Sequence, residues 1–283
     1  MNNQESEHQQ PVRAHKSPLP FAILQTGRLG DLWYTVPLAD YLTQNGQRVE
    51  VWYDQSFGNP FTYFPSVIPR PLPLPRLTHG FSVPANLLNS ISQQLYLYEK
   101  LRQLGRQIIW NQIHPLGIGA YFANRPYPEY WYRRYPEISF RHVQTTLQCH
   151  NDRTLLYFAS SVSLRVSAAN LYEDWLDRNL RLLQKLTGYR VLYVPPPGTP
   201  DHPTYETWRG NLEAYQELIA HCGLVFGIIT SAHVLGQLLG KPVVACYTSR
   251  RWIFDTIGGE TLRLFPGDHI SVEDSLKLAS SLH

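Results

Sequence analysis

The residue types and spacing at Gly27-Arg-Leu-Gly-Asp31 could carry acid–base chemistry. The apolar run Phe21–Thr26 precedes this motif, and an amphipathic segment from Leu32 to Leu42 follows it, which predicts strand, glycine-rich turn and helix. In open α/β folds such a turn lies at the carboxyl edge of a parallel sheet, where ligands bind. Asp31 is therefore a candidate general base, and helix N-capping is its structural alternative.

The other residues of this turn also have two interpretations. Gly27 and Gly30 either let the backbone approach a ligand or form a tight turn. Arg28 either contacts a ligand or is a solvated surface charge. The sequence leaves both choices open, and we treat all three residues as candidate site residues.

Small hydroxyl residues follow two predicted strands in the second half of the chain. Ser160 and Ser161 come after the strand Thr154–Ala159, and Thr230 and Ser231 open a predicted helix after another strand. The start of a helix stabilises negative charge through its N–H groups and its dipole, so these residues could hold phosphate oxygens. Simple helix capping is again the alternative.

The composition permits two domains of ordinary size. The chain has 283 residues, of which 43% are hydrophobic, and a net charge of +3 that does not by itself imply a nucleic acid or a membrane. Residues 1–19 are polar and contain prolines, which predicts a disordered tail and not a secretory signal. The longest apolar runs have about five residues, too few to span a bilayer.

Cysteine and histidine spacing indicates no metal site. The three cysteines are far apart and the eleven histidines are scattered, without the close spacing typical of metal ligands. We therefore expect no metal and no cofactor. A reduced, cytoplasmic protein is the simplest interpretation of three unpaired cysteines.

Strand-like and helix-like segments alternate in each half, which predicts a parallel α/β architecture. Residues 20–150 are expected to form an N-terminal Rossmann-like domain, and residues 151–283 a C-terminal one. We expect the two to face a central cleft. Pro37 predicts a kink or a late start in the helix Asp31–Gln44, and the proline-rich residues 54–85 predict an irregular or extended segment.

Two segments resemble one known family. The motif from Gly27 to Asp31, followed by Pro37, resembles the opening signature of heptosyltransferase-like enzymes of glycosyltransferase family 9, which have the GT-B fold. The segment from Glu217 to Ala245 resembles the donor-site signature of that family. The resemblance implies metal-independent, inverting transfer of a sugar from a nucleotide diphosphate sugar, with Asp31 as the base.

The resemblance also implies a set of donor-binding residues. Ser160, Ser161 and Arg165 have the spacing of the family's diphosphate contacts, and Asp201 matches its nucleoside contact. Thr230 and Ser231 lie within the donor signature. Aligned on Lys241-Pro242, however, the chain has Ile229 where the family has an aspartate and Val234 where it has a histidine. His233, one residue earlier, is the candidate substitute.

One segment does not follow from the family. Eight of the 22 residues from 121 to 142 are aromatic, whereas aromatic residues make up 13% of the whole chain. Four arginines are interleaved with them. The structural alternative is an inter-domain core with surface arginines. The functional one is an acceptor surface, because aromatic rings stack on sugars or bases and arginines pair with phosphates. The candidates there are Tyr130, Trp131, Arg133 and Arg134.

The resemblance implies a soluble glycosyltransferase of GT-B type that acts on a glycolipid or saccharide acceptor. In it, residues 20–150 would be the acceptor-side domain and residues 151–283 the nucleotide-sugar-binding domain. Gly27, Arg28 and Gly30 would lie on the acceptor side of the cleft. One alternative keeps the chemistry but takes DNA with hydroxylated bases, as phage enzymes do. A second is a non-catalytic nucleotide- or glycan-binding protein, which the altered donor signature leaves open. A third, a nucleotide-sugar epimerase, would need a second acid–base pair that the sequence does not offer.

Overall fold

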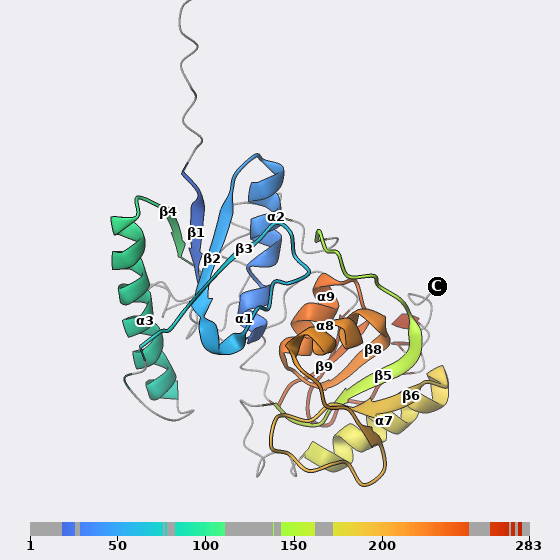
Figure 1. Cartoon of the computed structure of the whole chain (residues 1–283). Helices are drawn as coiled ribbons and strands as arrows, with labels where there is room; N and C mark the ends of the chain where they lie inside the picture. Colours follow the sequence, from blue (N-terminus) through green and yellow to red (C-terminus); the bar gives the residue numbers. More distant parts are fainter. Residues whose placement is uncertain are drawn as a thin grey trace, which may run out of the picture.

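A computed structural model describes residues 19–25, 29–75, 77, 83–110, 138, 143–161, 172–248, 261–271, 273–274 and 277–278. They form two β-sheets with parallel pairing between the neighbouring strands (Figure 1). The first sheet has the order β3 (Ile68–Leu72), β2 (Val49–Asp54), β1 (Phe21–Leu24), β4 (Gln107–Trp110). The second has the order β10 (Thr261–Leu264), β9 (Val243–Cys246), β8 (Cys222–Ile228), β5 (Asp152–Phe158), β6 (Arg190–Tyr193), β7 (Glu206–Thr207). The predicted α/β class is confirmed, and residue 150 falls between the two sheets.

Helices cover both faces of each sheet. We call residues 19–110 the front lobe; there α3 (Val83–Gln103) covers the outer face of the sheet, and α1 (Leu29–Trp33) and α2 (Val36–Gln44) face the rest of the molecule (Figure 1). We call residues 152–271 the rear lobe; its helix α7 (Glu173–Thr187) lies outside, while α8 (Leu212–His221) and α9 (Ser231–Leu238) face the front lobe.

The helix expected over Asp31–Gln44 is divided in two. It is interrupted at residues 34–35, and Pro37 lies in the first turn of α2. Proline is tolerated there because the first N–H groups of a helix have no intrahelical acceptor. The predicted interruption of the helix is confirmed, as a break at residues 34–35 just before Pro37. It leaves α1 as a separate single-turn helix that carries Asp31.

The proline-rich segment contains a strand that its composition concealed. β3 includes Pro69 and Pro71 and pairs with β2 alone, at the edge of the sheet. Backbone N–H groups alternate in direction along a strand, so prolines two residues apart can both turn their missing donors away from the only neighbour. The expectation of an irregular or extended segment is thus too coarse for residues 68–72.

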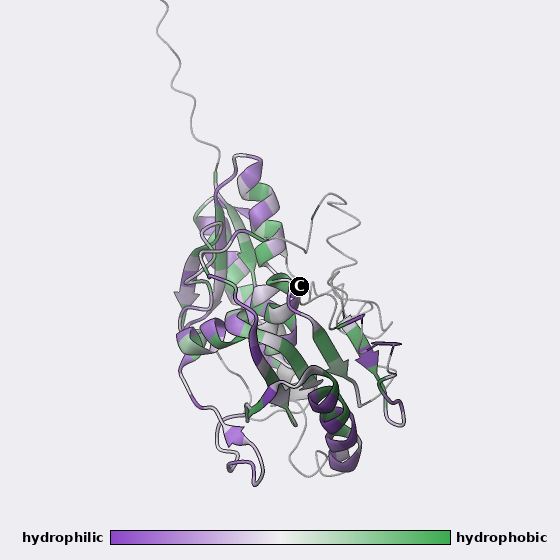
Figure 2. Ribbon diagram, turned by 90° about the vertical axis from the view of Figure 1, so that its right-hand side faces the viewer, coloured by the Kyte–Doolittle hydropathy of each residue, from purple (hydrophilic) through white to green (hydrophobic). Residues whose placement is uncertain are grey.

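The apolar core runs across both lobes without interruption. One cluster of buried side chains includes Ile23 and Trp33 of the front lobe together with Val225 and Leu235 of the rear lobe. Two smaller clusters lie beneath α3 and α7. Figure 2 shows apolar residues concentrated along the strands, as burial on both faces of a parallel sheet requires. Much of the space between the lobes is therefore filled by packed side chains.

A crossover segment is bonded to both lobes on its way between the sheets. Gln144 donates its N–H to the carboxylate of Asp40 on α2, and Thr146 donates to the carbonyl of Tyr63 at 2.9 Å. Farther on, His150 donates to the carbonyl of Ala220 at 3.1 Å. Burial raises the pKa of Asp40 despite its hydrogen bonds. These bonds limit how far one lobe can move from the other.

A buried carboxylate holds the front sheet together beneath α3. The Glu50 side chain, 1% exposed, lies 2.8 Å from a terminal nitrogen of Arg70 and 3.0 Å from Nε of Arg106. Trp52 donates its indole N–H to the same carboxylate at 3.2 Å. Burial alone would raise the pKa of Glu50, but the hydrogen bond and charge of Arg70, with the charge of Arg106, hold it below the usual range.

Replacing this carboxylate should destabilise the fold. We expect Glu50→Gln to lower the free energy of unfolding by about 1.5–3 kcal/mol at neutral pH, because hydrogen bonds to a charged group are lost. Since the folded pKa lies below the unfolded value of 4.5, the stabilisation is present above that pH and is lost as the pH falls through the folded pKa. Urea unfolding at several pH values measures both effects. Glu99→Gln, which removes the exposed pair with Arg102, is the control and should leave stability unchanged; equal stability of both variants would contradict the prediction.

Candidate functional site

The two candidate motifs meet where α1 packs against α9. α1 follows the carboxyl end of β1, and α9 follows the carboxyl end of β8. Gly30 faces the first turn of α9: a Cβ placed on it would lie 3.3 Å from Cα of Ser231 and 3.4 Å from Cγ2 of Val234. A side chain there would have to push the helices apart. Gly30 therefore allows close packing of the lobes, a role beyond the two that the sequence suggested.

A buried amide orients the turn that carries Asp31. Gln25 is 2% exposed, and its side-chain N–H donates to the backbone carbonyl of Asp31 at 2.7 Å. Its backbone N–H donates to the carbonyl of Trp52 at 3.0 Å, which ties the same residue to β2. Sequence analysis did not identify Gln25. The available signal was a polar residue at the end of an apolar strand.

Thr230 and His233 close the start of α9 as a capping box. The Thr230 hydroxyl accepts the N–H of Ala232 at 3.2 Å, and Nδ1 of His233 accepts the N–H of Thr230 at 3.0 Å. Histidine thus takes the place of the usual Glu or Gln at the third helical position. The prediction that Thr230 and Ser231 open a helix is confirmed.

His233 is fully buried in this arrangement. Its ring is 0% exposed, and with Nδ1 accepting, Nε2 carries the proton and faces the carbonyl of Gly227 at 3.1 Å. Burial lowers its pKa to about 4, so the ring is neutral at physiological pH. Both nitrogens are engaged in shaping the loop before α9. A direct contact of His233 with a donor stays a prediction.

A tyrosine hydroxyl lies beside the first residue of α9. The Tyr215 hydroxyl on α8 is 3.3 Å from Oγ of Ser231, and burial raises its pKa to about 12. The ring stacks on Trp33 of the front lobe at 6.3 Å between centroids and lies 6.1 Å from Trp208. Sequence analysis did not identify Tyr215, because its hydroxyl contact depends on the position of α9.

The serines of the rear lobe lie at the same sheet edge as Thr230. β5 and β8 are neighbours, with Phe158 opposite Gly227, so Ser160 and Ser161 follow one strand where Thr230 and Ser231 follow the next. Gly227 has φ +131, and a Cβ on it would lie 2.1 Å from the carbonyl oxygen of Phe158. Only glycine allows this approach. Both serines are buried, and the two pairs of hydroxyl residues follow neighbouring strands of one sheet. Their contact with a donor stays a prediction.

Of the remaining candidates, the structure describes Asp201. Asp201 is on an exposed loop after β6, where its carboxylate pairs with Arg209 at 2.8 Å. Its donor role stays a prediction. The other seven candidates fall outside the described residues: Gly27, Arg28, Tyr130, Trp131, Arg133, Arg134 and Arg165.

Two further properties concern only the described ranges. Within them, no group of three His, Cys, Asp or Glu side chains is arranged to hold a metal ion. None of the helices that the structure describes combines the length and apolarity needed to cross a membrane.

Comparison with solved structures identifies the fold. The E. coli heptosyltransferase WaaC with ADP is similar at a TM-score of 0.57 and 15% identity, covering 94% of this chain and 100% of that chain. WaaC with ADP-2-deoxy-2-fluoro heptose is similar at a TM-score of 0.55 and 16% identity, covering 87% of this chain and 93% of that chain. The glycosyl transferase family 9 protein from Veillonella parvula DSM 2008 is similar at a TM-score of 0.51 and 12% identity, covering 94% of this chain and 97% of that chain. No protein-family model matches the sequence, and no curated protein matches it.

The chain therefore has the GT-B fold of the glycosyltransferases. Within that class its architecture is similar to that of heptosyltransferases and family 9 proteins over nearly their whole length. The resemblance first seen in two short motifs is confirmed at the level of the fold. At these identities the likeness concerns the architecture alone.

A larger residue at Gly30 should separate the lobes. We expect Gly30→Val to lower the free energy of unfolding by about 1–3 kcal/mol, because the added carbons overpack the contact with α9. Val234→Ala should lower the free energy of unfolding less in the Gly30→Val variant than in the wild type, since it removes the methyl group that faces residue 30. The measurement is a double-mutant cycle by denaturant unfolding, with an expected coupling above about 0.5 kcal/mol. Additive effects would show that the two residues do not touch.

The buried histidine should make stability depend on pH. The pKa of His233 is near 6.5 in the unfolded chain and about 4 in the folded chain. The free energy of unfolding therefore falls as the pH falls from 6.5 towards 4. The loss from pH 8 to about pH 5 should be about 2 kcal/mol. His233→Gln keeps a capping acceptor but does not titrate, and should remove this part of the pH dependence. An unchanged pH profile in this variant would contradict the prediction.

Proposed function

We propose that this protein is a glycosyltransferase that moves a sugar from a nucleotide diphosphate sugar to an acceptor hydroxyl, with inversion and without a metal. The observation that supports this most is the contact between α1 and α9. It brings the turn of Asp31 in the front lobe beside the hydroxyl-rich start of α9 in the rear lobe. A base and an anion-stabilising helix start are the two elements that such a transfer requires.

In the proposed reaction Asp31 takes the proton of the acceptor hydroxyl. The acceptor oxygen forms a bond to the anomeric carbon of the donor, while the bond from that carbon to the diphosphate breaks and its electron pair leaves with the diphosphate. The developing negative charge is stabilised by the dipole of α9 and by hydroxyl groups at the same edge. Ser160, Ser161, Thr230 and Ser231 supply these groups, and the neutral Tyr215 hydroxyl orients that of Ser231.

The capping box determines how the donor side is shaped. Where the family signature has an aspartate and a histidine, this chain has Ile229 and Val234, and His233 is used to close the helix start from within. The loop before α9 thus keeps its conformation through internal hydrogen bonds. Preorganised groups of this kind stabilise a leaving diphosphate without further rearrangement.

The first donors to test are adenosine diphosphate sugars, since the similar WaaC structures hold ADP and an ADP-heptose analogue. Thermal shift against a panel of nucleotide diphosphate sugars should give a concentration-dependent rise in melting temperature for the true donor. The bound donor should be hydrolysed slowly to nucleoside diphosphate and sugar. Asp31→Asn should keep the thermal shift but lower the turnover about 10²–10⁴-fold.

Glu99→Gln, an exposed carboxylate on α3, is the control and should keep full turnover. Equal turnover by Asp31→Asn would remove that residue from the base role. Binding of a nucleotide sugar with no turnover under any condition would instead indicate a non-catalytic binding protein on this fold.

A further inference from the structure

Two aromatic side chains of the front lobe contact α8 of the rear lobe. Trp33, the last residue of α1, stacks on Tyr215 of α8 with 6.3 Å between ring centroids and 19° between ring planes. Tyr63 donates its hydroxyl hydrogen to the carboxylate of Glu217, also on α8, at 2.6 Å, and lies 3.4 Å from the carboxylate of Glu213. The hydrogen bond to Glu217 raises the pKa of Tyr63 above its usual value, so the hydroxyl remains a donor.

The two contacts are on nearly opposite sides of α8. An α-helix has 3.6 residues per turn, so side chains two positions apart point about 200° away from each other. Tyr215 is two positions from Glu213 and two from Glu217, whereas the two glutamates, four positions apart, share one side. The front lobe therefore holds α8 between Trp33 and Tyr63. We call this arrangement of the two side chains around α8 the clasp.

The two arms of the clasp are joined within the front lobe. Trp33 is fully buried, and its indole N–H donates to the carbonyl of Pro60 at 2.9 Å. Pro60 and Tyr63 belong to one loop, residues 58–67, which is packed into the apolar core by the buried Phe64. The hydrogen bond thus connects the side chain of one arm to the backbone that carries the other.

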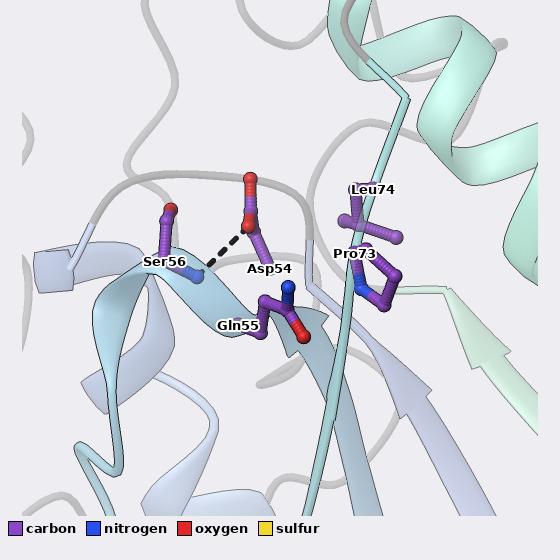
Figure 3. Close-up of a pocket in the computed structure, with 5 residues that line it drawn as sticks. All are labelled: Asp54, Gln55, Ser56, Pro73 and Leu74. Atoms are coloured by element: carbon purple, nitrogen blue, oxygen red, sulfur yellow. Dashed lines mark hydrogen bonds between the residues drawn. The ribbon is translucent and has the colours of Figure 1, made fainter.

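The loop that carries Tyr63 is itself fixed at two points. It follows the short 3₁₀ helix η1 (Gln55–Phe57), whose start is capped by the carboxylate of Asp54, which accepts the N–H of Ser56 at 3.0 Å (Figure 3). Farther along, the carbonyl of Tyr63 accepts the hydroxyl hydrogen of Thr145 in the crossover segment at 3.0 Å. Tyr63 therefore holds α8 from a defined position.

Through α8 the clasp reaches both halves of the candidate site. The Tyr215 hydroxyl is 3.3 Å from Oγ of Ser231, the first residue of α9. At the other end, Trp33 is two residues from Asp31 on the same single-turn helix. A shift of α8 against the front lobe would move the partner of the Ser231 hydroxyl, and so change the direction of that hydroxyl relative to Asp31.

We infer that Trp33 and Tyr63 are positioning residues, which hold α8 between them and thereby fix the Ser231 hydroxyl of the rear lobe relative to Asp31 of the front lobe. The inference rests on the proposed function for the reaction that these groups serve. The clasp itself is a property of α8 and can be measured without any donor. Groups that are aligned before the reaction lower its barrier, because no rearrangement is needed in the transition state.

Hydrogen exchange of the full-length chain tests the clasp. Tyr63→Phe keeps the ring and removes the hydroxyl, and should raise the exchange rate of the α8 amides about three- to tenfold, the effect of losing one hydrogen bond. α7, on the outer face of the same sheet, should exchange as in the wild type. Tyr96→Phe, exposed on α3, is the matched control and should leave both helices unchanged. Equal acceleration of α7 and α8 would indicate a general loss of stability and overturn the clasp, as would no change in α8.

A pair of tryptophan variants tests the other arm. Trp33→Phe keeps a ring against Tyr215 but loses the N–H that bonds to Pro60, and should accelerate exchange in α8 more than in α7. Trp175→Phe is the matched control, since the indole N–H of Trp175 on α7 donates to the carbonyl of Asp268 at 2.7 Å. It should accelerate α7 more than α8. The same pattern of exchange in both variants would contradict the clasp.

Donor hydrolysis tests the positioning role. Tyr63→Phe should lower kcat about fivefold, since a displacement of about 1 Å can cost up to 10²-fold in rate. Its affinity for ADP should be unchanged, because the nucleotide is proposed to bind to the rear lobe alone. Tyr215→Phe should lower kcat by a similar factor, and the double variant by no more than either single one. Additive losses of kcat, or an equal loss of ADP affinity, would overturn the positioning role.

The two measurements separate this inference from the proposed function. A wild-type chain that hydrolyses no donor, but whose α8 is released by Tyr63→Phe, would refute the transferase and leave the clasp intact. A wild-type chain that hydrolyses a donor, but whose α8 exchanges equally in Tyr63→Phe and Tyr96→Phe, would refute the clasp alone.

Discussion

The close approach of α1 to α9 is the contact on which the rest of the site depends. The absence of a side chain at residue 30 favours it, since a Cβ there would lie 3.3 Å from Cα of Ser231, a tight contact. Because α1 has a single turn and follows directly from the end of β1, its position determines where Asp31 lies. The same contact places the start of α9 next to the front lobe. One missing side chain therefore sets the distance between the two halves of the candidate site.

Buried polar groups maintain this geometry from both sides. Gln25 bonds to β2 and to the carbonyl of Asp31, so the front turn is tied to its sheet. His233 does the same for the rear loop, through Thr230 and Gly227. A buried polar group that loses its partner is costly, so each bond disfavours other conformations of the turn it holds. The altered donor signature is consistent with this picture: a histidine shifted by one residue reinforces the loop internally.

Local interactions were readable from the sequence alone. The helix start at Thr230 and the break near Pro37 follow from the preferences of single residues, and the structure confirms them. The alternation of strands and helices also sufficed for the α/β class. These features involve neighbours along the chain, whose distances are set by covalent geometry.

Contacts between distant segments required the tertiary structure. The pairing of the proline-containing β3 with β2 and the contact of the Tyr215 hydroxyl with Ser231 each involve residues from separate elements. Gly30 shows the difference most clearly: its sequence context indicated a tight turn or a ligand, but its closest neighbour is a helix some 200 residues away along the chain. The sequence determined which groups are available, whereas the packing of two lobes decided which of them meet, because only packing brings remote atoms within contact distance.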